Sequence, residues 1–440
     1  MVVEGYGLRK PPLRCVSAAA VGAHVCQHVE VSTIGLEGIL PWHQARSIAA
    51  TAARPLPATS ARLDEAMGAR LARAIATVQD DPPADAAAYD GFAVCGEGPW
   101  FVRPDGDEAA LRPGEAQRLA REEPVPAHCD AVLAREAAQL ERTAGTGSHD
   151  LRLLACDPLT GVPDERVRPD LGEGIVRQGT RSVAGHVTIG ADSPVTAATV
   201  SHAAALGHDH LEVVRTPVVG TLVLGSHLLD RGLPRHGRVR DALGAAVPAY
   251  IGSLGARGNP AVRAPDTIDL LMAEIDDAAV DVLVTTGSTA PGPDNHLRQA
   301  MRDLQARWLV DGVAVSPGAQ MLLAKLPDGR FIVGLPGQPA AALAALVTLV
   351  PPLIRGLRGE PVEHSLNTGV LVDDAPLADY ADDTGLVPVR LQSTRAGTAA
   401  SVVPATSGGP LAQWAAADAI AVVPPGGGRR GEPVELLPAP

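Results

Sequence analysis

The sequence predicts a multidomain α/β protein in which one doubly wound domain is flanked by smaller β-rich regions. Its 440 residues allow about two to four domains at roughly 150 residues per domain. Hydrophobic residues make up 46% of the chain and charged residues 20%, as in a globular protein with a large core. Strand and helix patterns alternate regularly between residues 217 and 358, which places the α/β domain there.

Within residues 217–358, apolar strand patterns are separated by helix patterns. Buried strands are predicted at "PVVGTLVLGS" and "VDVLVTTGS", and helices at "TIDLLMAEIDDAA" and "HLRQAMRDL". Strands without polar alternation are typical of a parallel sheet covered on both faces. The apolar run Ala340–Ile354 predicts a buried helix, because it is shorter than the ~20 residues that cross a membrane and Pro351-Pro352 interrupts it.

The rest of the chain divides by its local patterns. Residues 1–40 have no clear period and are expected to form a poorly ordered extension. Helices are expected at "LPWHQARSIAATAARPLPA" and at "ARLDEAMGARLARAIATV", where Thr59 or Ser60 caps the second. Short strands with Gly and Pro turns predict a β-rich lobe over residues 80–181 and a small all-β domain over residues 359–440.

Composition narrows the class of partner and the compartment. A formal net charge of −13 without a basic stripe argues against nucleic acid. The five cysteines form no CxxC pair, and an odd number argues against a disulfide framework. Free thiols and the lack of a Leu-rich signal segment favour a cytoplasmic protein without a membrane partner.

Two loops after predicted strands carry the residue types of an anion site. The loop "TTGSTAPGPDNH" offers Gly287 and Gly292 for close backbone approach, several hydroxyls, and Asp294 as a metal ligand. The stretch "GLPGQP" places Gly337 directly before a helix whose first position is Pro339. The N–H groups of a first helical turn favour a phosphate, although each loop by itself is equally consistent with a simple turn.

Other motifs are weaker. No Walker P-loop occurs and no GxGxxG follows a strand, which lowers the expectation of a dinucleotide dehydrogenase. His208 and His210 in "GHDH" are either metal ligands or part of a surface turn. Asp90 in "YDGFAV" is either a catalytic or metal-binding carboxylate or a turn residue.

Taken in order, four segments resemble the molybdopterin molybdenumtransferase family, which includes bacterial MoeA and the E domain of gephyrin. The segment "ADAAAYDGFAV" is similar to its D-x-S-x-M-D-G-[YW]-A, and "TTGSTAPGPDNH" to its [ST]-[ST]-G-G-x-S-x-G-x-x-D. In the same way "VSPGAQMLLAKL" is similar to K-P-G-K-P-x-x-F-G-K-L, and "GLPGQPAAAL" to G-L-P-G-N-P-x-[SA]-x. The joint order of four motifs is more specific than any one of them.

The resemblance implies a dimer with four subdomains per chain and an intersubunit site. These would be an elongated domain made of residues 41–79 and 182–216, the β-rich lobe, a MoaB/Mog-like molybdopterin-binding domain over residues 217–358, and a C-terminal β-barrel. It also implies that adenylylated molybdopterin and molybdate react with the aid of Mg²⁺ and release AMP. A molybdopterin adenylyltransferase or molybdenum-enzyme apoproteins are the protein partners it suggests.

The resemblance also assigns site residues. Asp90 and Asp294 would be catalytic and hold the metal. The substrate would be bound by Asp241, Thr285, Thr286, Gly287, Ser288, Pro317, Gly318, Lys325, Pro336, Gly337, Gln338 and Pro339.

Several motif positions depart from the family pattern. Gln338 replaces an Asn, Ser288 replaces the second glycine of the strand-end loop, and Asn295 stands at the place of its Asp. Ser316 and Ala319 replace both lysines of K-P-G-K-P, and the T-G-A-P turn reads Arg121-Glu122-Glu123-Pro124. The acids of R-R-x-G-E-D are replaced by Thr180 and Arg181, and those of T-G-D-E by His227 and Leu228. Together these changes remove acids that would hold Mg²⁺ and lysines that would meet oxyanions. They leave open an alternative function, a catalytically degenerate paralogue that binds a pterin, a nucleotide or a protein partner.

Overall fold

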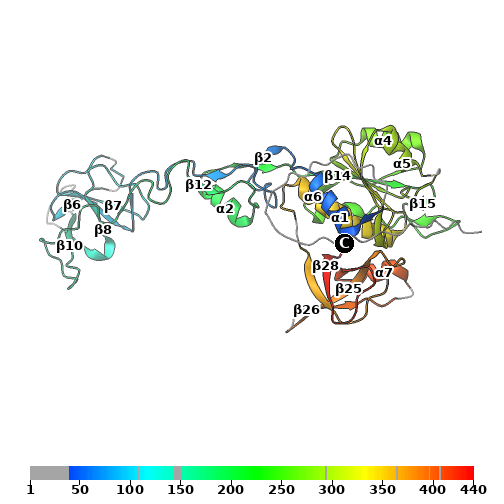
Figure 1. Ribbon diagram of the computed structural model, residues 1–440. Coiled ribbons are helices and arrows are strands. Elements are labelled where there is room, and N and C mark those ends of the chain that lie inside the picture. The colour runs from blue at the N-terminus through cyan, green and yellow to red at the C-terminus, as the bar shows by residue number, and fades with distance from the viewer. Residues whose placement is uncertain are drawn as a thin grey trace, which may run out of the picture. The chain divides into compact units, whose positions relative to one another are not determined.

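The computed structural model describes most of the chain beyond the N-terminal region. The described residues are 39–104, 106–107, 109–142, 151–292, 295–362, 365–395, 397–405 and 408–440. The expected extension therefore lies outside the described residues, except for residues 39 and 40. Helices and strands carry the labels of Figure 1.

A seven-stranded mixed sheet forms the centre of the α/β domain. Its strands are β14 (Val218–Leu224), β17 (Arg257–Gly258), β18 (Val262–Ala264), β19 (Val282–Thr286), β20 (Arg307–Asp311), β22 (Leu322–Lys325) and β23 (Phe331–Leu335). Their order is β17-β14-β19-β23-β22-β20, with β18 also beside β14. The pairs from β17 to β23 are parallel, whereas β22 runs antiparallel to both β23 and β20. The predicted α/β fold is confirmed, with an antiparallel hairpin at one edge.

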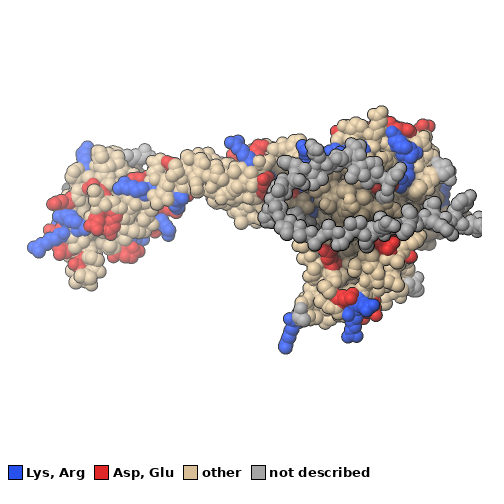
Figure 2. All heavy atoms as spheres, viewed as in Figure 1, with Lys and Arg blue, Asp and Glu red and all other residues tan. Residues whose placement is uncertain are grey.

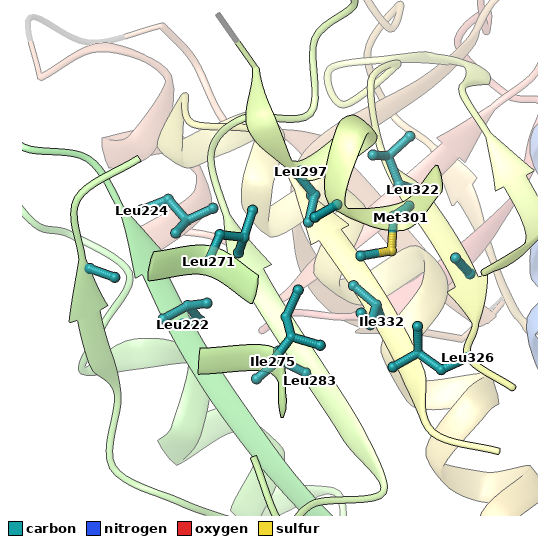
Figure 3. Packing of buried hydrophobic residues seen from close by; sticks show 13 residues of the cluster. Leu222, Leu224, Leu271, Ile275, Leu283, Leu297, Met301, Leu322, Leu326 and Ile332 are labelled. Atoms are coloured by element: carbon teal, nitrogen blue, oxygen red, sulfur yellow. The ribbon is translucent and has the colours of Figure 1, made fainter. Parts of the chain in front are cut away.

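Helices cover both faces of this sheet. On one face, α4 (Ile268–Asp277) and α5 (His296–Asp303) pack on the strands through a cluster of buried side chains, shown in Figure 3. This cluster includes Leu222, Leu271, Ile275, Leu283, Leu297, Met301 and Ile332. The alternate strand residues Val223, Val284 and Val333 are buried as well. Helices α3 (Ala246–Ser253) and α6 (Pro339–Leu357) contact β14 and β23, so the strands are apolar on both sides.

Helix α6 confirms the buried helix predicted over Ala340–Ile354 and continues through Pro351 and Pro352 to Leu357. The two prolines lack the N–H groups that would bond the carbonyls of Val347 and Thr348. The Arg46 guanidinium donates to both carbonyl oxygens instead, at 2.9 and 3.4 Å. The helix is apolar enough to cross a membrane by composition, and 72% of its most apolar window is buried inside the structure, as expected for a core helix.

The first expected helix is confirmed as α1 (Trp42–Ala52), but the second is not formed. Its residues instead contain β2 (Ala58–Arg62), turns and β3 (Ile75–Ala76), which pair with β13 (His210–Val214) and β12 (Val187–Ile189). Gly68 has φ +81° in the middle of the expected helix, and its N–H donates to Val195 O. Strand pairing and this left-handed residue override the helical spacing. Helix α2 (Ala197–Ala205) follows, capped by Thr196.

A six-stranded sheet lies within the residues predicted as the β-rich lobe. Its strands are β5 (Gly91–Val94), β6 (Trp100–Val102), β7 (Glu115–Leu119), β8 (Ala131–Ala134), β9 (Ala138–Arg142) and β10 (Leu151–Ala155), in the order β8-β5-β7-β6-β10-β9. The 3₁₀ turn η1 (Arg135–Ala137) joins β8 to β9, and β4 (Ala86–Ala87) pairs with β11 (Ile175–Val176) beside the sheet. Buried Phe92, Trp100 and Leu153 belong to its core.

The C-terminal strands close into a five-stranded barrel, as predicted. They are β24 (Asn367–Leu371), β25 (Thr384–Thr394), β26 (Gly397–Val402), β27 (Ala419–Val423) and β28 (Pro433–Pro438). The ring runs β25-β26-β24-β28-β27 and closes through the antiparallel pairing of β25 with β27. Strands β1 (Leu40–Pro41) and β21 (Val313–Ser316) extend this sheet beyond β25, and α7 (Gly409–Ala415) precedes β27.

The bond from Arg46 to the carbonyls of α6 gives a stability prediction. Arg46→Ala should lower the free energy of unfolding by about 2 kcal/mol or more, because two carbonyls lose their donor. In a Pro351→Ala/Pro352→Ala background the helix regains its own N–H donors, so the same substitution should cost about 1 kcal/mol or less. Denaturant unfolding of the four variants in a double-mutant cycle measures this difference. Equal costs in both backgrounds would contradict the role given to Arg46.

Candidate functional site

Three parallel strands end at one edge of the α/β sheet and their loops meet there. The Gly287 N–H, after β19, donates to Leu335 O at the end of β23, at 2.8 Å. A Cβ on Gly287 would lie 3.3 Å from Leu224 O at the end of β14, and Gly287 has φ +89°. A Cβ on Gly337 would lie 3.7 Å from the Gly287 Cα. The strand-end loop and the GLPGQP turn are therefore in contact, as a shared site requires.

In the loop after β19, the threonine hydroxyls are less exposed to solvent than the glycine backbone. Thr285 and Thr286 are the last two residues of β19 and are 0% and 3% exposed. Thr285 Oγ1 has no hydrogen-bond partner among the described residues. Gly334 is equally enclosed, because a Cβ there would lie 3.0 Å from Thr289 Cγ2. The exposed part of this edge is therefore the glycine backbone that follows each strand.

Helix α6 begins at Pro339, as predicted, and Gln338 is its N-cap. Gln338 Oε1 accepts a hydrogen bond from the Ala341 N–H at 2.6 Å, so the longer side chain still performs the capping expected of an Asn. The Gly337 N–H has no partner in the described part of the chain, whereas Ala340 of the first turn is buried. Gly337 is exposed and Pro336 is buried, so the turn offers backbone donors at the positive end of the α6 dipole.

Ser288 occupies a backbone conformation that favours glycine, with φ +60°. Its hydroxyl donates to Asp266 Oδ2 at 2.7 Å, and His296 Nδ1 lies 3.2 Å from Asp266 Oδ1. Asp266 follows β18, so a fourth strand end reaches the site. The sequence reasoning missed Asp266 and His296; the position of Asp266 just before a predicted helix was the available signal. Asp294 lies outside the described residues.

Pro317 and Gly318 lie beside the first turns of α6. A Cβ on Gly318 would lie 3.2 Å from Ala341 O and 3.1 Å from Ala344 Cβ, so a larger residue would push this turn away. Ser316, at the position of a family lysine, donates to Asp379 Oδ2 at 2.7 Å. The structure thus brings Pro317 and Gly318 to the N-terminal end of α6 and uses Ser316 to tie β21 to a C-terminal residue.

The structure does not bring Lys325 to these loops. Lys325 pairs with Phe331 at the start of β23, whereas the loops follow Leu335 at its end. Its Nζ lies 4.9 Å from the Phe331 ring centroid. Because β22 runs antiparallel to β23, Lys325 lies at the opposite end of the sheet.

Both carboxylate oxygens of Asp241 accept hydrogen bonds from groups of the protein itself. Oδ1 accepts hydrogen bonds from the Leu243 and Gly244 N–H groups, both at 2.9 Å, and Oδ2 accepts two from Arg263. Burial acts to raise the pKa of Asp241, but these N–H groups and the Arg263 guanidinium outweigh it and hold the pKa below its ordinary value. The side chain is 3% exposed. It joins the segment before α3 to β18, close to the short pair β15 (Leu228–Leu229) and β16 (Val239–Arg240).

Asp90 is exposed at the start of β5 in the β-rich lobe. Its Oδ1 accepts the Arg121 N–H at 2.8 Å, so it is attached to the turn that replaces T-G-A-P. In that turn Glu122 has φ +67° at the position of the family's glycine, and Glu122 Oε1 pairs with Arg181 at 3.0 Å. The side-chain contact helps to hold a conformation that glycine would adopt without strain.

The metal hypothesis for the histidine pair gains no support. His208 Nε2 lies 2.8 Å from Ala76 O, as in a structural hydrogen bond. No group of three or more His, Cys, Asp or Glu side chains that could hold a metal occurs among the described residues.

Comparison with known protein families identifies the chain. Residues 40–207 match the MoeA N-terminal region (domain I and II), and residues 220–356 match a probable molybdopterin binding domain. Together the two matches cover more than half of the chain. The chain belongs to the MoeA family.

Curated relatives of this MoeA-family chain are molybdopterin molybdenumtransferases. The one from Bacillus subtilis is 28% identical over 273 residues, which are 61% of this chain and 60% of that protein. The match thus spans about three fifths of that relative's length. The one from Staphylococcus epidermidis is 24% identical over 381 residues, or 82% of this chain and 85% of that protein.

Among solved structures, the molybdopterin biosynthesis MoeA protein from Pyrococcus horikosii is similar in fold. It has a TM-score of 0.69 and 22% identity, and the match covers 92% of this chain and 100% of that chain. At this identity the likeness concerns the fold, and it confirms the multidomain α/β class.

The Gln338 cap yields a prediction for the GLPGQP turn. Gln338→Ala should lower the free energy of unfolding by about 1 kcal/mol, because the Ala341 N–H loses its acceptor. Gln338→Asn should retain most of that stability, since its shorter amide can cap a helix in the same way. Denaturant unfolding distinguishes the two, and a neutral Gln338→Ala would mean that the cap is not formed in solution.

The lowered pKa of Asp241 predicts a pH-dependent contribution to stability. A carboxyl with a lowered folded-state pKa stabilises the protein above its unfolded-state pKa of about 3.9, and this is lost as the pH falls through the folded-state value. Asp241→Asn should therefore lower the urea midpoint at pH 7, and the gap from the parent should narrow as the pH falls from about 3.9 to the folded-state pKa. A gap that does not change with pH would contradict this.

Proposed function

We propose that this protein is a molybdopterin molybdenumtransferase of molybdenum cofactor biosynthesis, which binds adenylylated molybdopterin, inserts molybdate and releases AMP. The observation that carries the proposal is the contact between the loops after β14, β19 and β23 beside the first turn of α6. Glycine backbone and helix N–H groups of this kind suit a phosphate. The names of the curated relatives support the same activity.

Each part of the loop cluster has a role in this proposal. The Gly337 N–H, at the positive end of the α6 dipole, would bind the pterin phosphate, and Gly287 would allow the phosphate close to the backbone. Asp266 would hold the loop through Ser288, while Pro317 and Gly318 would support the start of α6. Thr285 and Thr286 would act by fixing the end of β19. Asp241 would position the segment before α3 instead of contacting the substrate, and Lys325 would take no part.

Mg²⁺ fits the donors only if the substrate supplies some ligands. Mg²⁺ in phosphate-transfer sites is held by one or two carboxylates together with phosphate oxygens and water. Asp90 and Asp294 would be those carboxylates, and the bound ion would neutralise phosphate charge during cleavage of the phosphoanhydride. Asp90 Oδ2 has no protein partner among the described residues, which leaves it available for this role.

We further propose a cytoplasmic homodimer in which the β-rich lobe of one subunit, with Asp90, faces the α/β loops of its partner. A molybdopterin adenylyltransferase or a molybdenum-enzyme apoprotein would be the protein it meets before or after the reaction. The retained loop contacts and the Gln338 cap favour an active transferase over a degenerate paralogue, because the substituted positions still perform their structural tasks.

Turnover tests the proposal directly. Purified protein supplied with adenylylated molybdopterin, molybdate and Mg²⁺ should release AMP, and the gene should restore cofactor synthesis in a strain that lacks its own molybdenumtransferase. Binding of the adenylylated pterin without AMP release or restoration would favour the degenerate paralogue. Absence of binding in calorimetry would contradict both functions.

Gly287→Ala tests the loop contact within this activity. The substitution places a Cβ 3.3 Å from Leu224 O at φ +89°, so the loop must shift. Affinity for the adenylylated pterin should fall by about ten-fold or more. Gly252→Ala, in α3 with open space around it and no positive φ, is the matched control and should leave affinity unchanged. Equal effects of the two substitutions would argue against a ligand at this loop.

A further inference from the structure

A cavity lies in the β-rich lobe, and none of its lining residues belongs to the loops after β14, β19 and β23. Its volume is about 400 Å³. Its walls come from β5, β7, the η1 turn and β9, and they include Asp90, Phe92, Arg118, Leu119, Arg135 and Leu140. Figure 2 shows basic and acidic side chains interspersed on this lobe, which Figure 1 identifies by β6, β7, β8 and β10.

The charged groups of the cavity favour an anion. Arg118 and Arg135 supply two positive charges and Asp90 one negative charge, so the lining is net positive on a chain of net charge −13. Neither arginine has an ion-pair partner among the described residues. The Arg118 guanidinium carbon lies 5.9 Å from the Phe92 ring centroid, and the Arg135 N–H donates to Asp90 O at 3.1 Å. Both arginines thus line the cavity without forming an ion pair with another described side chain. Two such guanidinium groups suit a phosphate.

The apolar walls and the size of the cavity indicate a larger ligand than a simple oxyanion. Phe92, which pairs with Arg118 across β5 and β7, is 5% exposed at the bottom of the cavity, whereas Leu140 is 39% exposed at the edge strand. Small-molecule pockets typically measure about 300–1,000 Å³ and combine apolar walls with a few polar groups. A lone tetrahedral anion would contact the arginines and leave these apolar walls in water. A phosphate joined to a flat ring would cover both.

We propose that this cavity is a subsite for a nucleoside monophosphate. Arg118 and Arg135 bind the phosphate, and the nucleobase lies against Leu140 and the edge of Phe92. The inference rests on the proposed function, since the adenylyl group leaves the substrate as AMP. The proposal gives the β-rich lobe a nucleotide-binding role in addition to that of the Asp90 carboxylate. The arginines that bind the phosphate would lie outside the motif positions at which lysines are replaced.

Calorimetry of the full chain with AMP, adenosine, inorganic phosphate and molybdate as separate probes tests the subsite. AMP should bind more tightly than adenosine, phosphate or molybdate, because only AMP uses both the arginines and the apolar walls. Arg118→Ala and Arg135→Ala should each weaken AMP binding by about ten-fold, as for loss of one charged hydrogen bond. Arg166→Ala, an exposed arginine of the same lobe outside the cavity, should leave it unchanged. Thermal unfolding of each variant verifies that the lobe is folded.

Each contrary outcome has a distinct meaning. Molybdate binding as tight as AMP and equally dependent on the arginines would overturn the nucleotide assignment in favour of an oxyanion site. If Gly287→Ala weakens AMP binding and the two arginine variants leave it unchanged, the nucleotide binds on the α/β loops, and the subsite is overturned. Arginine-dependent AMP binding without turnover of adenylylated molybdopterin would leave the subsite standing and overturn the proposed function.

Discussion

Helix α6 is buried between the α/β sheet and α1, and two of its carbonyl groups depend on a hydrogen-bond donor from α1. Pro351 and Pro352 remove two N–H groups from the helix, and buried carbonyls without a donor are costly. Arg46 of α1 donates to both carbonyls, while the Trp42 indole N–H donates to Thr348 Oγ1 at 3.0 Å. The same contacts join α1 to α6. The other end of α6 forms one wall of the candidate site, so a fixed helix means a fixed site.

The site itself is made by backbone more than by side chains. Gly287, at φ +89°, lets the end of β19 approach the end of β14, where a Cβ would lie only 3.3 Å from Leu224 O. The threonines at the end of β19 are buried. The exposed backbone of Gly337 and the positive end of the α6 dipole favour an anion. Such a site tolerates many side-chain substitutions as long as the glycines and the first turn of α6 remain.

The substituted motif positions show how this tolerance operates. Ser288 and Glu122 occupy left-handed conformations at former glycine positions, and each makes a side-chain contact, with Asp266 and with Arg181. Ser316 no longer carries a lysine charge but bonds to Asp379. Arginines beside Asp90 provide positive charge in the β-rich lobe. The left-handed conformations are therefore retained by residues other than glycine.

The sequence by itself determined the α/β class, the order of its strands and helices, and the two glycine loops, because buried strands and helix starts leave strong local patterns. It also placed Pro339 at the start of α6. Tertiary structure decided the rest. Pairing of β2 with β13 replaced an expected helix, and Arg46 carried α6 through its prolines. Contacts between residues far apart in the chain also decided three features of the site, and local patterns do not contain such contacts. These features are the hydrogen bonds that occupy the Asp241 carboxylate, the distance of Lys325 from the loops, and the contact of Asp266 with Ser288.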